Sequence, residues 1–424
     1  MGAIGLACFF ANGRPAARMG SRAFHPAAVI AAISKPSIPG DASQQRWPWW
    51  PLLPLYPYGR RRSLVRELIP GQVWGVEQLL GVFYVAVPIR MTVLRLRQGL
   101  LLYAPVAPTA ELRAALAELE QLHGPVVTIV LPTSSGLEHK LPVPAMARAF
   151  PKAQVWVTPG QWSFPLTLPL SWLGFPAQRT RVLFEQGLPN EDQLDWCALG
   201  PLDLGLGNFF EAACLHRASG SLLLTDALVA IGEQPPSIFD ADPKPLLFHA
   251  RERADQPLLD SPDLRRKGWW RLVLFASFLR PEQLALSGLG ELLQQAWSAS
   301  QQQGGAANAL YPFRWQANWQ EEFRQLVPAG EPLIQVAPVL ERLVFPRHRG
   351  LLINWLRQLA QLGDIRQLVP AHYEAPVPCT AAALQELAKQ LSLRPWAVDE
   401  HSWRYLASID RNLLKLGVVP NRDH

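Results

Sequence analysis

The chain has 424 residues, of which 49% are hydrophobic, and it carries a net charge of +6. Such an apolar content supports a sizeable core, so we expect a folded globular protein of one large domain or two ordinary ones. The small excess of basic residues is dispersed and no nucleic-acid-reading motif is present, so we expect no nucleic-acid partner. The cysteines lie far apart without C-x-x-C spacing, which argues against a disulfide framework and a structural zinc knuckle and favours a reducing compartment. They are Cys8, Cys197, Cys214 and Cys379, and they look like inert core thiols.

Residues 1–45 form a basic segment rich in Ala, Gly and Pro, in which the first acidic residue is Asp41. This composition fits a cleavable organellar presequence, a disordered tail, or an upstream start codon with the working start at Met19. No stretch of the chain reaches the roughly 20 apolar residues that cross a bilayer. We therefore expect a protein that does not span a membrane.

Residues 46–90 begin with a run dense in Trp and Pro, Trp47–Tyr58, which Arg60, Arg61 and Arg62 follow. Proline at this density forbids helices and central strands, so we expect an extended strap that buries its aromatic rings against the surface of the protein. A proline-rich ligand for another protein is the alternative interpretation.

Residues 91–239 alternate between strand and helix patterns. Strands are predicted at 91–96, 100–103, 126–131 and 154–157, and helices at 109–122 and 144–150. Thr109 is a good N-cap for the first of these helices and Gly124 a good stop. Two further strands, 211–216 and 221–225, are predicted to form a hairpin. This order is typical of an α/β protein built in layers.

Residues 240–345 are predicted to form a mainly helical insertion, residues 346–395 the second α/β part, and residues 396–424 a C-terminal helix and tail. Within the insertion, Arg265–Leu279 combines a basic cluster, paired tryptophans and a short apolar run. This pattern fits either a core helix with a basic flank, which we favour, or an interfacial helix in peripheral contact with an anionic membrane.

Three strands are followed by residues that bind metals or transfer protons. The apolar run that ends at Leu131 breaks into a small-residue loop that carries Glu138 and His139, Asp226 follows Leu222–Thr225, and His372 follows Gln367–Pro370. If these strand ends converge, they form a His/Asp/His constellation suited to a divalent metal or to acid–base work. His216, at the end of 213–216, is the reserve ligand.

Each of these residues also has a structural interpretation. Glu138 and His139 fit an ordinary surface turn, His216 a buried imidazole that donates to a backbone carbonyl, and Asp226 a cap for the next segment. His372 lies in a polar loop, where a functional role is the better interpretation.

The order of these elements resembles the metallo-β-lactamase-like superfamily, and more closely an uncharacterised domain-of-unknown-function family, number 4336, of oxygenic phototrophs. The segments that carry the closer match are Val87–Val93, Tyr103–Pro108, Leu131–Lys140, Gln161–Pro165, Leu224–Asp226 and Pro370–His372. The resemblance implies an αββα sandwich with any metal site at the strand ends along one edge. It also implies a soluble protein of the cytoplasm, or of the plastid stroma if residues 1–40 are a presequence.

The superfamily binds metal through an H-x-H-x-D-H loop, a later His, an Asp at a strand end and a final His. Here Ser134 and Gly136 stand where the first two histidines belong, Glu138 replaces the Asp, and His139 is retained. Asp226 and His372 match the later Asp and the final His, whereas no His stands around 204–208.

A dinuclear site needs about six or seven ligands, so the resemblance implies at most one divalent ion, zinc, iron or manganese, or none. The first hypothesis is a single-metal hydrolase of ester, thioester or phosphodiester bonds, with His139, Asp226 and His372 as ligands and Glu138 as second-shell partner or general base. The alternative is a non-catalytic binding or assembly protein of a photosynthetic cell, docking through the strap or through residues 265–279. In either case the partner is an unidentified small molecule or protein.

Overall fold

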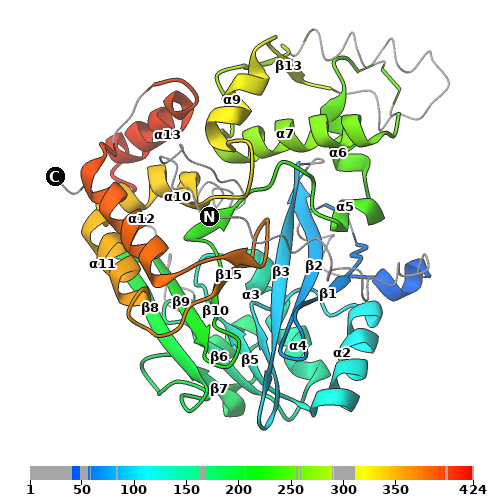
Figure 1. The fold of residues 1–424 in the computed structure, drawn as a ribbon, viewed down its shortest axis with the longest axis vertical. Coiled ribbons are helices and arrows are strands. Elements are labelled where there is room, and N and C mark those ends of the chain that lie inside the picture. Colours follow the sequence, from blue (N-terminus) through cyan, green and yellow to red (C-terminus); the bar gives the residue numbers. More distant parts are fainter. Residues whose placement is uncertain are drawn as a thin grey trace.

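The computed structural model describes residues 41–47, 56–57, 59–82, 85–161, 168–205, 207–254, 256–257, 259–288, 290, 311–396 and 400–422. Two β-sheets pack face to face, and helices cover their outer faces (Figure 1). The chain is therefore an αββα sandwich, as the sequence predicted.

The first sheet has seven strands that lie side by side in chain order. They are β1 (Leu64–Ile69), β2 (Val73–Val82), β3 (Val85–Leu96), β4 (Gly99–Tyr103), β5 (Val126–Leu131), β6 (Gln154–Val157) and β7 (Thr180–Val182). The strands β1 to β4 are antiparallel neighbours, and β4 to β7 are parallel. Parallel neighbours need crossover connections, which here run through α2 (Ala110–His123), α3 (Leu137–Lys140) and α4 (Val143–Ala149).

The second sheet has five strands in the order β16-β15-β10-β9-β8. They are β8 (Leu194–Asp203), β9 (Asn208–His216), β10 (Ser221–Leu224), β15 (Gln367–Pro370) and β16 (Val377–Pro378). β15 enters the sheet parallel to β10, far from it in sequence. The helices α11 (Arg349–Leu359) and α12 (Ala381–Leu393) lie beside this sheet (Figure 1).

The space between the sheets is filled by apolar side chains from both of them. Leu101 and Val130 of the first sheet share one buried cluster with Ala212 and Leu223 of the second. Tyr103, also buried there, donates a hydrogen bond of 2.9 Å to the carbonyl of Ala212. This satisfied phenol ties the two sheets together without leaving a buried polar group unpaired.

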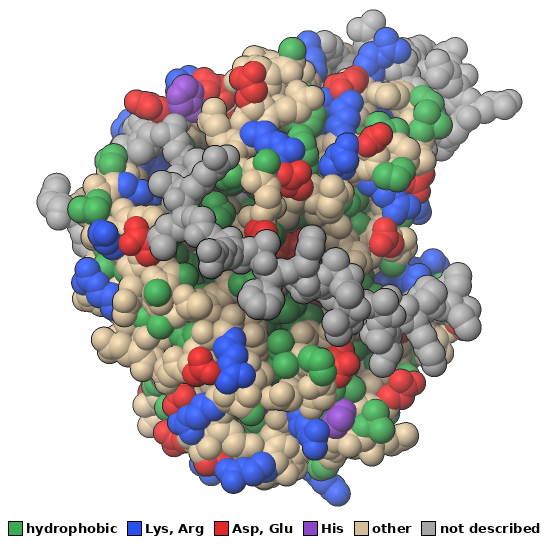
Figure 2. Space-filling view, viewed as in Figure 1, with side chains coloured by type: hydrophobic (Ala, Val, Ile, Leu, Met, Phe, Trp, Pro, Cys, Tyr) green, Lys and Arg blue, Asp and Glu red, His purple; other side chains and the backbone are tan. Residues whose placement is uncertain are grey.

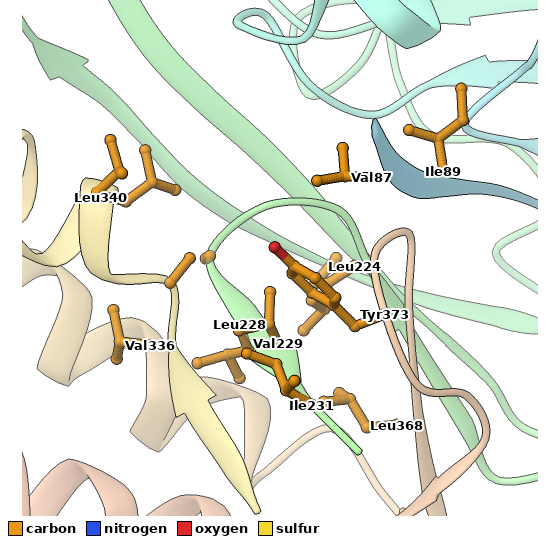
Figure 3. Close-up of a cluster of buried hydrophobic side chains, with 14 of the residues drawn as sticks. Val87, Ile89, Leu224, Leu228, Val229, Ile231, Val336, Leu340, Leu368 and Tyr373 are labelled. Carbon is orange, nitrogen blue, oxygen red and sulfur yellow. The ribbon is translucent and has the colours of Figure 1, made fainter. Parts of the chain in front are cut away.

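The described parts of residues 238–343 lie above the sandwich in Figure 1. Their described helices are α5 (Ile238–Ala241), α6 (Lys244–Ala250), α7 (Pro262–Phe278), α9 (Trp319–Leu326) and α10 (Pro338–Leu343), and their strands are β12 (Leu284–Leu286), β13 (Phe313–Trp315) and β14 (Ile334–Val336). β14 pairs with β11 (Leu228–Ala230), and α13 (Trp403–Lys415) closes the chain beside α10. Figure 3 shows Val336 and Leu340 of this part on one side of Leu228 and Val229, with Leu368 and Tyr373 on the other. The upper part is thus packed onto the second sheet through one continuous apolar cluster.

Regular structure begins earlier than the sequence predicted. Residues 64–90, assigned to the strap, form β1, β2 and the first half of β3, because the prolines thin out after Pro57 and apolar residues take over. Trp47 and Tyr56 are buried, as expected of a strap, whereas residues 48–55 and the tail 1–40 lie outside the described residues. Short 3-10 helices occur at Ala42–Gln45, Leu170–Leu173, Ala177–Arg179 and Phe345–Arg347.

Candidate metal centre

The candidate site lies where three strands end. β5 leads into the loop before α3, which carries Glu138 and His139, whereas Asp226 follows β10 and His372 follows β15. Because β10 and β15 are parallel neighbours, Asp226 and His372 leave the second sheet at the same edge. Isolated bridges between Thr133 and Glu211 and between Ile89 and His372 bring the ends of the two sheets together there.

The four side chains form one compact buried group. The Nε2 atom of His372 lies 3.3 Å from Oδ1 of Asp226 and 3.9 Å from Oε1 of Glu138. Glu138, His139 and His372 each offer one ligand atom, and these atoms all lie within 4.8 Å of one another. His139 is fully buried, and His372 is the most exposed of the four at 7%. The surface-turn interpretation of Glu138 and His139 is therefore wrong.

Both imidazole rings are fixed by backbone carbonyls. Nδ1 of His139 lies 3.1 Å from the oxygen of Pro105, and Nδ1 of His372 lies 3.1 Å from the oxygen of Pro88. A carbonyl oxygen only accepts, so each Nδ1 carries the proton and each neutral ring keeps a lone pair on Nε2. Neither Nε2 atom has a hydrogen-bond partner. A ring held in this way is arranged to bind a metal.

The two carboxylates present further unpaired acceptors. Both oxygens of Glu138 and Oδ1 of Asp226 are buried without a hydrogen-bond partner. The other oxygen of Asp226 accepts from the hydroxyls of Thr133, at 3.0 Å, and Ser135, at 3.3 Å. Five buried acceptor atoms thus lie together without a donor, and such atoms are costly unless a cation binds them.

Glu211 of β9 supports this group from behind. Its carboxylate accepts hydrogen bonds from the backbone N–H groups of Thr225 at 2.5 Å, Asp226 at 3.2 Å and Ala227 at 2.8 Å. These bonds fix the turn after β10, and with it the position of the Asp226 side chain. Asp226 does not act as a cap for the next segment through its side chain, which bonds Thr133 and Ser135 instead.

The electrostatics show an excess of negative charge in a buried place. Burial and the nearby Asp226 raise the pKa of Glu138 to about 7, and the same two causes raise the pKa of Glu211 to about 7. Burial lowers the pKa of His139 to about 4, which keeps its ring neutral. Burial alone would lower the pKa of His372, but the Asp226 carboxylate raises it. A divalent cation would relieve the repulsion between these carboxylates.

Arg90 holds the loop that carries His372. Its guanidinium donates to the carbonyls of Pro370 and Tyr373, both at 2.5 Å, and to Oε1 of Glu77 at 2.8 Å. Burial alone would raise the pKa of Glu77, but Arg90 and Arg66 lower it, so the pair is ionised. Sequence reasoning missed this support, although Arg90 lies inside one of the segments that carried the family resemblance.

Ser134 and Gly136, which stand where the superfamily has histidines, have structural roles in this chain. Oγ of Ser134 donates to the carbonyl of Asn208 and accepts from the N–H of Phe210, both at 2.9 Å, which ties the loop to β9. At Gly136 an added Cβ would lie 2.6 Å from Oε1 of Glu138, so the longer acidic side chain fills the space beside the glycine. Ser134, Gly136 and Glu138 therefore fit one another as a set.

His216, the reserve ligand, lies away from this group. It pairs with Ser221 at the start of β10, whereas Asp226 follows the far end of the same strand. Its Nδ1 atom lies 2.8 Å from the hydroxyl of Ser219, not from a backbone carbonyl as the structural interpretation predicted. Cys197, Cys214 and Cys379 are buried free thiols, and Cys8 and Trp162–Pro165 lie outside the described residues.

Charged and aromatic side chains of α7, the helix considered for membrane contact, form contacts within the protein. Arg265 pairs with Asp240 and Asp260, Lys267 with Glu252, and Trp269 is fully buried. Among the described residues, no helix combines the length and the apolar character needed to span a bilayer. Peripheral contact through residues 265–279 stays a prediction.

The two packed sheets and the helices on their outer faces define the class of fold, an αββα sandwich with a group of buried acidic and histidine side chains at its strand ends. The family described as "Domain of unknown function (DUF4336)" matches residues 70–389, and the chain belongs to this family. No curated protein matches the chain.

Solved structures to which the chain is similar are metallo-β-lactamases. The enzyme from Pontibacter korlensis shares 12% identity over 77% of this chain and 99% of its own, with a TM-score of 0.34. FIM-1 from Pseudomonas aeruginosa in the mono-zinc form shares 9% sequence identity over 78% of this chain and 97% of its own, with a TM-score of 0.32. The metallo-β-lactamase from Erythrobacter litoralis shares 10% sequence identity over 77% of this chain and 92% of its own, with a TM-score of 0.29. At these scores the fold assignment rests on the sheets and helices of the chain itself.

Proposed function

We propose that this protein binds one divalent metal ion through Glu138, His139, Asp226 and His372 and is a single-metal hydrolase. The observation that carries the proposal is the group of five buried acceptor atoms, from four side chains, that lack hydrogen-bond partners and face one another. Solvent does not reach these atoms, and the repulsion between the carboxylates, which together with burial raises the pKa of Glu138, would be relieved by a cation. This supports a metal over a shared proton.

The donor set fits zinc, iron or manganese. Two neutral imidazole nitrogens suit these three metals, and two carboxylates supply charge that offsets a divalent ion. Hard ions such as calcium prefer six or more oxygen ligands, which this site does not offer.

A bound ion of this kind would act as a Lewis acid and generate a nucleophile from water at neutral pH. The residues of the chain set up this chemistry: the carbonyls of Pro88 and Pro105 fix the two imidazoles, and Thr133 and Ser135 hold one oxygen of Asp226. Esters, thioesters and phosphodiesters are the bonds that such a site hydrolyses without a second ion.

A second candidate function is a non-catalytic binding protein in which the ion is structural. The burial of all four side chains favours it, because a catalytic ion must be reached by its substrate. In that case removal of the metal would lower the melting temperature, and no hydrolysis would accompany its binding.

The test is metal content by plasma mass spectrometry on untagged protein purified without chelator. We expect about one zinc, iron or manganese per chain, lost in His139→Ala and in His372→Ala. His216→Ala is the matched control, since it removes an equally buried histidine from the other end of the sheets. Metal that is absent from the wild type after reconstitution, or retained by both site variants, would overturn the proposal.

A screen of ester, thioester and phosphodiester substrates on the loaded protein separates the two functions. Turnover that disappears in His372→Ala but persists in His216→Ala supports the hydrolase. Bound metal that raises the melting temperature without any turnover supports the structural role.

A further inference from the structure

A groove lies at the end of the sandwich opposite the candidate metal centre. The turn between β3 and β4, the turn between β9 and β10, and the segment that leads into β8 form its walls, with a volume of about 600 Å³. Its polar lining includes Gln72, Arg95, Arg97, His123, Gln193 and His216. The volume lies in the range of pockets that bind small molecules. Lys and Arg side chains gather at this lower end of the molecule (Figure 2).

The walls of the groove are fixed by their own contacts. Arg97 pairs with Asp192, and its N–H donates to Oε1 of Gln193 at 2.8 Å. On the other wall Arg217 pairs with Asp195, and its N–H donates to the carbonyl of Gln193 at 3.2 Å. The Arg97 contacts join the end of β3 to the segment before β8, and the Arg217 contacts fix the turn after β9 on that segment, so these walls of the groove are held in place before anything binds.

His216 presents a polar atom to this groove from a buried ring. The residue is only 2% exposed, and its Nδ1 atom is engaged with the Ser219 hydroxyl at 2.8 Å. Among the described residues its Nε2 atom has no partner, although the side chain lines the groove. A buried imidazole destabilises the protein unless both of its nitrogens form hydrogen bonds. The unpaired Nε2 at the groove is therefore a position at which a ligand could supply the second hydrogen bond.

Two other groups in the groove have no strong partner in the part of the chain that the structure describes. Among the described residues Arg95 forms no ion pair and makes one long contact, of 3.4 Å, with the carbonyl of Gly71, whereas Asp192, the carboxylate that also lines the groove, pairs with Arg97. The side-chain amide of Gln72 makes no hydrogen bond there. Arg95 is therefore the guanidinium that is free to bind an oxyanion, whereas Arg97 and Arg217 already pair with aspartates.

We propose that this groove binds a small phosphorylated molecule that also carries hydroxyl groups, such as a sugar phosphate. Arg95 binds the phosphate, and the Gln72 amide and Nε2 of His216 bind the hydroxyls. The site is separate from the metal centre, because none of Glu138, His139, Asp226 and His372 lines it.

The experiment is isothermal titration calorimetry of the full chain with ribose 5-phosphate, inorganic phosphate and ribose. We expect saturable binding of ribose 5-phosphate, weaker binding of phosphate and none of ribose. Arg95→Gln should weaken the binding of ribose 5-phosphate by at least about tenfold, the loss typical of a removed hydrogen bond to a charged group. His216→Phe, which removes a hydrogen bond to a neutral hydroxyl, should weaken it by about fivefold. Arg113→Gln, an exposed arginine on α2 outside the groove, is the matched control and should bind as the wild type does.

Absence of saturable binding by the wild type would overturn the proposal. So would equal weakening in Arg113→Gln, which would mean that overall charge and not the groove attracts the anion. Equal affinity for inorganic phosphate and ribose 5-phosphate would overturn the roles of Gln72 and His216. If His216→Phe fails to fold, Arg95→Gln still decides, because that side chain is exposed and its loss leaves the core intact.

Discussion

Two groups of buried charged side chains meet the loop that carries His372, and they differ in the balance of their charges. In one, the carboxylate of Glu77 accepts from the guanidinium groups of Arg66 and Arg90. In the other, Glu138 and Asp226 lie among two imidazoles whose free nitrogens are acceptors. The first group sets two guanidinium groups against one carboxylate, although Oε2 of Glu77 has no hydrogen-bond partner, whereas the second sets two carboxylates against the nearby Lys140. Buried charged side chains that pair with one another, as in the first group, stabilise the fold. Buried acceptor atoms without hydrogen-bond partners, as in the second group, favour a binding site for a cation.

The largest effect is expected at the first group. Arg90→Met would leave Glu77 short of its buried partner and would free the carbonyls of Pro370 and Tyr373. We expect the free energy of unfolding in urea to fall by about 3–5 kcal/mol. Arg66→Met, at the half-exposed side of the same carboxylate, should cost about 1 kcal/mol or less. Equal decreases in the free energy of unfolding in the two variants would show that Arg90 stabilises the His372 loop no more than Arg66 does.

A smaller effect is expected at Glu322 of α9, a largely buried carboxylate with one unpaired oxygen but no neighbouring histidine ligand. Burial raises its pKa to about 7, above the ordinary value of 4.5, so the folded protein loses stability as the pH rises between these values. Glu322→Gln should remove this loss and stabilise the protein by about 2 kcal/mol at pH 8, with little change at pH 4.5.

Urea unfolding at the two pH values measures this difference, and metal content should stay as in the wild type. We expect a lone unpaired carboxylate to take up a proton and a set of several acceptors to take up a cation. A Glu322→Gln variant that loses the metal, or that is no more stable than the wild type at pH 8, would contradict this expectation.

Gly136→Ala tests the site without touching its ligands. The added Cβ would lie 2.6 Å from Oε1 of Glu138, and since φ is −73° the backbone itself tolerates alanine. We expect the displaced carboxylate to weaken metal affinity by about tenfold or more, while the metal-free protein unfolds at nearly the wild-type urea concentration. Competition with a chromophoric chelator measures the affinity. Gly350→Ala in α11, where nothing lies within 4 Å of the new atom, should leave it unchanged.

The smallest effect is expected at the surface of α7. Arg266 pairs with Asp263 one turn away, and both side chains are exposed. Arg266→Gln should change the free energy of unfolding by less than about 0.5 kcal/mol. A loss of several times this size would contradict the expectation that an exposed ion pair contributes much less to the free energy of unfolding than the buried Arg90 does.

Sequence patterns sufficed for most of the sandwich and for three residues that the structure brings together at its strand ends. Alternating apolar runs and a Thr109 N-cap locate β4, α2 and β5 to within a residue or two, and polar residues after strands identify His139, Asp226 and His372. Such signals are local, because periodicity and capping depend on neighbours in the sequence.

The support of the site could not be found in this way. The carbonyls of Pro88 and Pro105 have no side-chain signature, and the pairing of Glu77 with Arg90 depends on the register of β2 against β3. His216 ends a strand, which suggests a reserve ligand, but the antiparallel hairpin of 211–216 with 221–225, which the sequence also predicts, places it at the opposite end from Asp226. The register of β2 against β3, in contrast, is a property of the sheet that a single strand does not reveal.

The insertion of β15 beside β10 also has a consequence for the order in which the protein matures. His139 is made in the first half of the chain and His372 near its end, and β15 brings His372 into the sheet only after the whole upper part has been synthesised. Contacts between such distant segments form late, since the intervening chain must first be ordered. A nascent chain that has not yet released residues 367–372 carries Glu138, His139 and Asp226 but lacks His372. Under the proposed function, the ion would bind completely only after β15 has joined the sheet, and a chain truncated before β15 should bind it more weakly.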